Sequence, residues 1–309
     1  MTDERRIESI PGVCDVERLG RSAGAPTLLI ELPHGATRGS DFDALAARLI
    51  SMLPDRLREF FFVNTDVGCH EAARLIAARL VDHFRDGPAV EVVIVRSLLP
   101  RTLVDCNRLL AASADDARRM TPAIPSYVDR REDRVMLADL YARYRRLVER
   151  AYEALDADRG WALQLHTYAP RSIQIDTIDG SIVETLREAY APENYDRWRS
   201  RPSVELISED PAGVMLAPAR LVTAIKRHYR AAGIELAENE TYRLHHDTTG
   251  YVDAARRPGR VCCVELNRGL LAEPFAPFEE MRVGAAKLER LAGPLASAYI
   301  EIIEEGAGA

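Results

Sequence analysis

Apolar residues in this chain form short runs in which nearly every position is hydrophobic, separated by longer stretches with helical spacing. The runs lie at 27–32 ("TLLIEL"), 89–99 ("AVEVVIVRSLL"), 160–169 ("GWALQLHTYA"), 203–208 ("SVELIS") and 260–267 ("RVCCVELN"). Runs of this kind predict strands that are buried on both faces of a sheet. The aromatic run "EFFFVNTD" at 59–66 is interpreted as a further strand.

Helical spacing of apolar residues appears between these runs, at 41–53, 69–84, 131–157 and 278–303. Strands that alternate with helices favour a mostly parallel sheet covered on both faces. We therefore expect an α/β fold of three layers, with helices on both sides of one mixed, mostly parallel sheet. The sequence shows neither a repeat nor a linker, so residues 1–309 are interpreted as a single domain. Within it, residues 1–25 are an N-terminal extension, and residues 234–260 are an excursion over the edge of the sheet.

Charge and composition narrow the range of partners and the cellular compartment. The chain has 309 residues and a net charge of −7 at pH 7, which disfavours binding to the phosphates of duplex nucleic acid. No apolar segment reaches the length that crosses a bilayer, and the first residues, "MTDERRIESIPG", lack an apolar signal core. The five cysteines include no CxxC pair, which is typical of reduced thiols. We expect a cytoplasmic protein that binds neither nucleic acid nor membrane, and its oligomeric state stays open.

Polar residues suited to chemistry follow several of the predicted strands. His34 and His166 end two of them, Asp66 ends the run at 59–66, and Glu265 lies near the end of the last. Glu209 and Asp210 follow the run at 203–208. Ligands bind at the carboxyl ends of strands in sheets of this class. Histidine and carboxylate ligands suit a catalytic zinc site, which keeps one position open for water.

The order of these motifs resembles that of the N-formylglutamate amidohydrolase family. The residues that carry the resemblance are "PHG" after the first strand, "NTDVG", "RTLVDCNR", "LQLH", "RPSVELISED" and "VELNR", which together span roughly 27–270. The resemblance implies a fold similar to that of the zinc carboxypeptidases, of the phosphorylase/hydrolase-like class. The sequence departs from the family at 245–260, within the predicted excursion. We interpret 234–260 as a substrate loop, so the departure bears on the substrate side chain more than on the hydrolytic core.

The resemblance also implies a set of metal ligands. His34 and His166 match the two histidine ligands of Zn²⁺ or another divalent metal. Carboxypeptidases place a glutamate three residues after the first histidine, and that position is Thr37 here. We therefore expect Asp66 to be the third ligand, with Glu71 as the alternative.

Further residues match the groups that bind and activate the substrate. Asn107 and Arg108 match the pair that holds a substrate carboxylate, for which the planar fork of arginine is well suited. Glu265 matches the general base that takes a proton from water. Arg101 is expected either to polarise the scissile carbonyl or to hold a second carboxylate. His246 is a candidate for substrate contact.

These matches lead to two hypotheses of different classes. The first is a metal-dependent amidohydrolase that cleaves the amide of an N-acyl amino acid, as in N-formylglutamate, by metal-activated water. The alternative is a non-catalytic protein of the same fold that binds a small carboxylate beside an incomplete metal site. The missing glutamate three residues after His34 supports the alternative.

Overall fold

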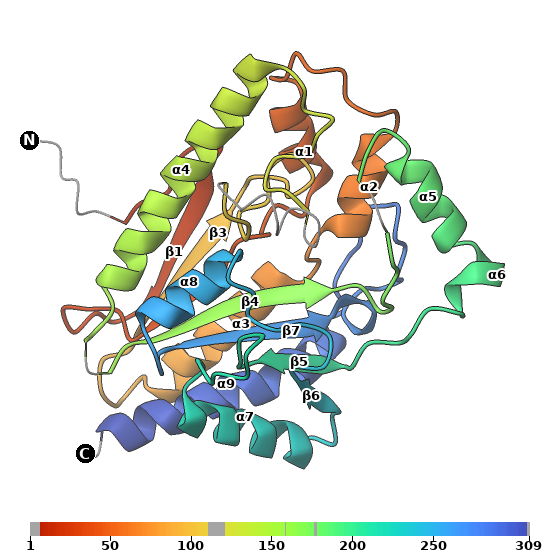
Figure 1. The fold of residues 1–309 in the computed structure, drawn as a ribbon. Coiled ribbons are helices and arrows are strands. Elements are labelled where there is room, and N and C mark those ends of the chain that lie inside the picture. The colour runs from red at the N-terminus through yellow and green to blue at the C-terminus, as the bar shows by residue number, and fades with distance from the viewer. Residues whose placement is uncertain (1–6, 111–120, 158, 176–177, 308–309) are drawn as a thin grey trace, which may run out of the picture.

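The computed structural model describes residues 7–110, 121–157, 159–175 and 178–307, and Figure 1 shows their fold. A sheet of seven strands runs through the middle of the molecule. The strands are β1 (Cys14–Gly20), β2 (Leu28–Leu32), β3 (Glu91–Ser97), β4 (Trp161–Tyr168), β5 (Val204–Ile207), β6 (Leu236–Glu238) and β7 (Val261–Asn267).

The order of the strands across the sheet is β1-β3-β2-β4-β7-β5-β6. The four central strands β3, β2, β4 and β7 are parallel to one another. β1 joins one side antiparallel to β3, and β5 joins the other side antiparallel to β7. The carboxyl ends of the central strands therefore meet at one edge of the sheet.

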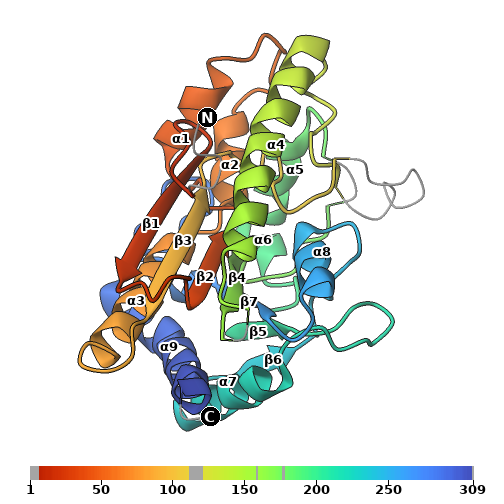
Figure 2. The same cartoon turned by 90° about the vertical axis from the view of Figure 1, so that its left-hand side faces the viewer.

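Helices cover both faces of the sheet, as Figures 1 and 2 show. One face packs against α1 (Gly39–Ala46), α2 (Leu57–Asn64), α4 (Arg131–Glu153), α5 (Ile182–Ala189) and α8 (Thr249–Arg256), and the other against α3 (Cys69–His83), α7 (Ala219–Ala231) and α9 (Ala285–Ala307). The short helix α6 (Pro192–Tyr195) follows α5, and the 3₁₀ turn η2 (Arg268–Leu270) follows β7. The expected three-layer α/β fold with a mixed, mostly parallel sheet is confirmed.

The two apolar cores follow from the alternation of side chains along each strand. In β2, Leu28, Ile30 and Leu32 face the core with α3, α7 and α9, while Leu29 faces the core on the other side. Both faces of β2 are thus apolar, which explains why its run in the sequence is hydrophobic without interruption. Complete burial of a side chain of this size contributes about 1.5–3 kcal/mol.

The interpretation of residues 59–66 as a strand is wrong. Residues 57–64 form the helix α2, and Asp66 lies just beyond its end. A short run that is apolar at consecutive positions has the same pattern in a buried strand and in a buried helix. Phe60, Phe61 and Phe62 are all buried, which is why no polar position reveals the helical period.

The position of Glu209 and Asp210 also differs from the expectation that strand-end acids gather at one edge. β5 runs antiparallel to β7, so the residues that follow β5 are not carried to the edge where β2, β4 and β7 end. Glu209 instead pairs with Arg243 at 2.8 Å. A strand's direction depends on its partners in the sheet, and a hydrophobic run does not reveal it.

The predicted N-terminal extension and the predicted excursion over the sheet edge both contain helices or strands. Residues 1–25 include β1, which pairs with β3 along its whole length. Residues 234–260 include β6 and α8. None of the helices in the described ranges is long and apolar enough to span a membrane.

Candidate active site

A cavity of about 590 Å³ opens where the central parallel strands end. His34 reaches it from the turn after β2, His166 from β4 and Glu265 from β7. Asp105, Asn107 and Arg108, which follow β3, also line the cavity. A single cavity thus collects residues from four neighbouring strand ends, as expected for a sheet of this class.

His34 is placed by a close approach between the turn after β2 and the end of β3. The backbone N–H of Gly35 donates to the carbonyl of Leu32, and Arg96 Nε of β3 donates to the carbonyl of Gly35 at 2.8 Å. A Cβ atom at residue 35 would lie 2.4 Å from Arg96 Cγ. Glycine is therefore needed at residue 35 for β2 to turn here and hold His34 at the edge of the sheet.

Asp66 is held between two helices. Arg268, which is buried, donates to the carbonyls of Val63 and Thr65 at the end of α2. Gly68 then adopts φ 87° immediately before α3 begins, a conformation that favours glycine. These contacts fix the short connection on which Asp66 lies.

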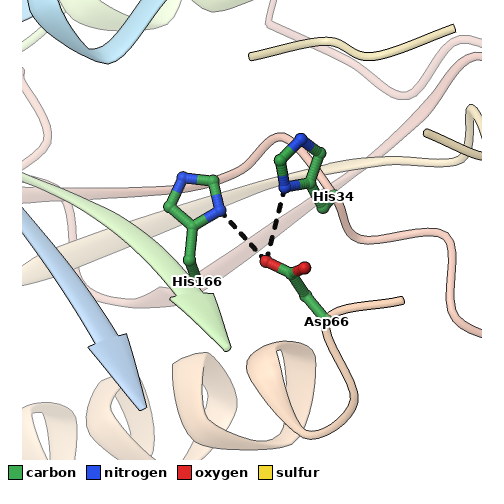
Figure 3. A group of neighbouring side chains, drawn as sticks. All are labelled: His34, Asp66 and His166. Atoms are coloured by element: carbon green, nitrogen blue, oxygen red, sulfur yellow. Dashed lines mark hydrogen bonds and ion pairs between the residues drawn. The ribbon is translucent and has the colours of Figure 1, made fainter. Parts of the chain in front are cut away.

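His34, Asp66 and His166 converge on one point, as Figure 3 shows. Asp66 Oδ2 lies 3.0 Å from His166 Nδ1 and 3.4 Å from His34 Nδ1. The backbone N–H of Thr167 also donates to Asp66 Oδ2 at 3.1 Å. One ligand atom from each of the three residues lies within 4.8 Å of the others, and all three residues are buried.

This group fits a divalent metal ion. His34 Nδ1 and Asp66 Oδ1 are buried and have no hydrogen-bond partner in the described part of the chain. Unpaired polar atoms in a protein interior are costly, and a cation would satisfy both. Two imidazoles and a carboxylate form a ligand set that suits zinc. Burial acts to raise the pKa of Asp66, but His34 and His166 hold it below its usual value, which keeps a carboxylate available.

Glu71, the alternative third ligand, is placed differently. It lies in the first turn of α3, where its side chain is exposed, and it is not a member of the group. Asp66 is the carboxylate that lies beside both histidines.

Asp105 supports His34 from the side away from Asp66. Its Oδ1 lies 2.7 Å from His34 Nε2 and accepts from the backbone N–H of Asn107 at 2.8 Å. Burial acts to raise the pKa of Asp105, but His34 and the guanidinium groups of Arg101 and Arg108 hold it well below its usual value. An ionised carboxylate on Nε2 favours the tautomer in which the lone pair of Nδ1 faces the metal position.

His166 has a comparable support in Gln164, two residues earlier on β4. Gln164 Nε2 donates to Glu31 Oε2 at 3.2 Å, so its Oε1 faces His166 Nε2 at 3.4 Å. Glu31 is fully buried and also accepts from Tyr144, Tyr152 and Arg145. These donors surround both of its oxygens, which fixes the orientation of the Gln164 amide. The amide oxygen then favours a proton on Nε2 of His166 and a lone pair on its Nδ1.

Glu265 lies directly beside His166 in the sheet. It is the Cα partner of His166 on the adjacent parallel strand, so both side chains extend from the same face of the sheet. Its Oε2 is buried with no hydrogen-bond partner among the described residues. Burial raises the pKa of Glu265 to about 7. A carboxylate with a pKa in this range can accept or donate a proton near neutral pH.

Arg101 and Arg108 differ in whether a carboxylate already pairs with the guanidinium. Arg101 lies between two carboxylates, 3.5 Å from Asp66 Oδ1 and 3.4 Å from Asp105 Oδ2. Among the described residues, Arg108 has no ion pair with a carboxylate and its buried Nε has no hydrogen-bond partner, and burial lowers its pKa. Both residues line the cavity, but Arg108 has the freer guanidinium.

The orientation of Asn107 is set by its neighbours. Its Oδ1 accepts from Thr249 Oγ1 at 3.0 Å and from the backbone N–H of Gly250 at 3.2 Å. The Nδ2 group consequently lies on the opposite side of the amide, 3.5 Å from His166 Nε2. Asn107 therefore offers a donor to the cavity, next to Arg108.

Of the two adjacent histidines at 245 and 246, His245 lines the cavity. His246 is not among the lining residues, and its side chain is 54% exposed. The two rings stack with their centroids 4.2 Å apart. A substrate contact by His246 is therefore not evident in this arrangement.

Three supporting residues, Gln164, Arg268 and Glu205, were given no role from the sequence. Glu205 is the Cα partner of Glu265 on β5, and it accepts from the backbone N–H of Tyr242 at 3.2 Å. All three residues contact residues that are distant along the chain. Only the contact between Gln164 and His166 is local. The alternation "QLH" on one strand was the only local signal, since it places Gln164 and His166 on the same face.

Comparison with known proteins gives similarity at the level of structure only. No family model matches the sequence, and no curated protein matches it either. N-formylglutamate amidohydrolase from Ralstonia eutropha JMP134 matches with a TM-score of 0.57 and 19% identity, covering 95% of this chain and 98% of that one. A gene product from Agrobacterium tumefaciens matches with a TM-score of 0.53 and 16% identity, covering 98% of both chains.

A more distant match is a metallo-carboxypeptidase from Burkholderia cenocepacia, with a TM-score of 0.40 and 13% identity, covering 97% of this chain and 66% of that one. This similarity is too low to support an argument. The first two matches extend over nearly the whole length of each chain. At the level of the fold they confirm the resemblance seen in the sequence motifs, and the chain therefore has the fold of N-formylglutamate amidohydrolase.

Proposed function

We propose that the chain is a metal-dependent hydrolase that cleaves the amide bond of an N-acyl amino acid. The observation that carries the proposal is the convergence of His34, Asp66 and His166 on one point, beside a cavity that His34, His166, Glu265 and Arg108 line. This set contains a metal site, a proton acceptor and a cation for a carboxylate. The N-formylglutamate amidohydrolase that shares the fold supports the choice of an amide as the bond cleaved.

The proposed role of each residue follows from its charge and from whether it already has a partner in the protein. His34, Asp66 and His166 would hold zinc or another divalent cation, which when bound polarises a carbonyl and makes water a stronger acid. Arg108 and Asn107 both present donors to the cavity and would bind the substrate carboxylate. Correct placement of this kind lowers the barrier because the reacting groups are held in position.

Glu265 would accept the proton from the attacking water and pass it to the leaving amine. Its unpaired Oε2 and its raised pKa suit both steps. Arg101 is already balanced by Asp66 and Asp105, so we assign it to the scissile carbonyl in preference to a second carboxylate.

The contrasting hypothesis was a binding protein with an incomplete metal site. It depended on the missing glutamate three residues after His34. The position of Asp66 beside both histidines weighs against it, so we do not propose it.

The decisive test of the proposed function is metal content together with hydrolysis. We expect about one divalent metal ion per chain, and loss of amide hydrolysis when a chelator removes it. Adding zinc back should restore turnover. The matched variant Asp66→Asn should bind the metal more weakly, while Glu71→Gln should behave like the wild type. A protein that hydrolyses N-acyl amino acids equally well without metal would contradict the proposal.

The proposed role of Glu265 predicts a defined dependence on pH. A general base acts in its ionised form. We therefore expect kcat/KM to be low at pH values below the pKa of Glu265 and to rise as the pH increases through that pKa. Burial raises that pKa to about 7, and a bound cation would lower it. We therefore expect a midpoint between about pH 5 and about pH 7 in the acidic limb of a kcat/KM profile. A flat profile between pH 5 and about 8 would exclude this role.

Gln164 gives a prediction about metal affinity that does not depend on turnover. In Gln164→Leu, the contact with His166 Nε2 is lost, and metal affinity should fall about 10–100-fold, as is usual for residues that orient a ligand. Tyr144→Phe is a matched control because it removes one donor to Glu31 without touching His166. Competition with a chromophoric chelator measures both. Equal losses in the two variants would mean that metal affinity depends on the buried group around Glu31 as a whole and not on the contact between Gln164 and His166.

A further inference from the structure

One wall of the cavity is apolar. It is built by two elements that lie side by side, α2 and α5, together with the segment that leads into α5. The lining side chains are Phe60 and Val63 from α2 and Ile178, Ile182, Leu186 and Tyr190 from the second part. Ile173 and Ile175 continue the same wall toward β4.

In the described part of the chain, the charged residues nearest this wall are arginines that already have partners, among them Arg268, which donates to the carbonyls of Val63 and Thr65. Between Ile173 and Tyr190, none of the described residues that line the cavity carries a charge. Arg171 lies just before this stretch, but its guanidinium donates to Asp196 Oδ1 and to the carbonyl of Trp198, each at 2.8 Å. An acidic group placed against the wall would lose its water and would have to displace the present partners of Arg171 or Arg268 to gain an ion pair, which is unfavourable.

The size of the cavity points the same way. A volume of about 590 Å³ is typical of pockets that enclose a drug-sized ligand and that combine apolar walls with a few polar groups. A formyl group and a glutamate side chain would leave most of the wall in contact with water. A larger apolar group would cover Ile178, Leu186 and Tyr190 and release that water.

We propose that the substrate carries a bulky apolar group, a branched aliphatic or aromatic one, which packs against the wall formed by α2 and α5. This inference rests on the proposed function and names its substrate class as N-acyl amino acids with a large hydrophobic arm. The arm is either the side chain of the amino acid or the acyl group. The carboxylate on Arg108 and the amide at His34, Asp66 and His166 are common to both forms.

A substrate panel tests the inference and separates the two forms. One series keeps the formyl group and varies the amino acid among glycine, glutamate, leucine and phenylalanine. The other keeps glycine and varies the acyl group among formyl, acetyl and octanoyl. We expect kcat/KM to rise at least about tenfold from glycine to leucine or phenylalanine, or from formyl to octanoyl, which lies in the range that pockets give for added methylene groups.

The outcomes distinguish this inference from the proposed function. Hydrolysis in which formylglutamate is preferred to every apolar substrate would overturn the inference and leave the proposed function standing. If the metal-loaded protein hydrolyses no member of either series, both are overturned.

A pair of variants on α5 tests whether the apolar wall causes the preference for apolar substrates. Leu186 lines the cavity, whereas Val183 is a buried residue of the same helix and is not among the lining residues. Leu186→Ala should lower the ratio of kcat/KM for the preferred apolar substrate to that for formylglycine about tenfold. Val183→Ala should lower stability but leave this ratio unchanged. The ratio does not depend on the fraction of folded protein, and an unchanged ratio in Leu186→Ala would remove the wall from substrate binding.

Discussion

Replacing Glu265 with glutamine is expected to lower kcat about 10²–10⁴-fold, which is the usual contribution of a positioned acid or base. Glutamine keeps the shape of the side chain but cannot accept the proton. Glu265 Oε2 has no partner in the described structure, so the substitution breaks no hydrogen bond of that oxygen. We therefore expect the metal content to be unchanged, which can be measured on the same sample as turnover.

Glu205→Gln provides a matched control for Glu265→Gln. Glu205 is buried and is the Cα partner of Glu265 on the next strand, but it does not line the cavity. Its substitution should change kcat by less than about tenfold, because a supporting residue acts only through the loop that it holds. If Glu265→Gln lost its metal, the residue would be a ligand. If it stayed fully active, the base would be another residue.

Where the sheet is parallel, the ends of the apolar runs indicate which residues lie together. His34 and His166 were selected because each ends a strongly apolar run, and β2 and β4 are neighbours that run in the same direction. The carboxyl ends of such strands must meet, so two local signals were enough to predict a common site. Glu265 is included for the same reason, since β7 is the next parallel strand.

The ends of apolar runs do not indicate this where the direction of a strand, or the secondary structure itself, depends on distant contacts. Asp66 was selected as the end of a strand, although it follows a helix, and its position relies on the contacts of Arg268 with the end of α2. Glu209 was grouped with the strand-end acids, although β5 runs antiparallel. A short apolar run contains information about burial and none about its partner strand, so these features could not be read from the chain alone.

The supporting interactions around the site show a further limit of the sequence. Glu31 of β2, which is 0% exposed, binds Arg145 of α4, and Arg145 binds Asp253 of α8 at 2.8 Å. These three residues form a charged network between the sheet and the two helices. Its members come from three distant parts of the chain, and each alone has the pattern of an ordinary strand or helix residue. Only their pairing in space shows that the amide of Gln164, and through it His166, is held in one orientation.

Arg108 is expected to make the second large contribution to turnover. A guanidinium that grips a carboxylate makes two charge-assisted hydrogen bonds, each worth roughly 1.5–3 kcal/mol. Their loss in Arg108→Ala corresponds to about 10²–10⁴-fold in kcat/KM, since each 1.4 kcal/mol is a factor of ten. Lysine has no planar fork, so Arg108→Lys should be nearly as damaging.

The comparison that identifies the role of Arg108 uses two kinds of substrate. For an N-acyl amino acid the loss should be large, and for the matching amide, which lacks the carboxylate charge, it should be small in both variants. Arg171→Lys is a suitable control, because Arg171 also lines the cavity but its guanidinium is engaged by Asp196 and Trp198. Equal losses on the acid and the amide would assign Arg108 to the fold or to the scissile carbonyl. Recognition of the carboxylate would then pass to Arg101, whose two carboxylate neighbours already balance its charge, and the substrate would have to compete with Asp66 and Asp105 for it.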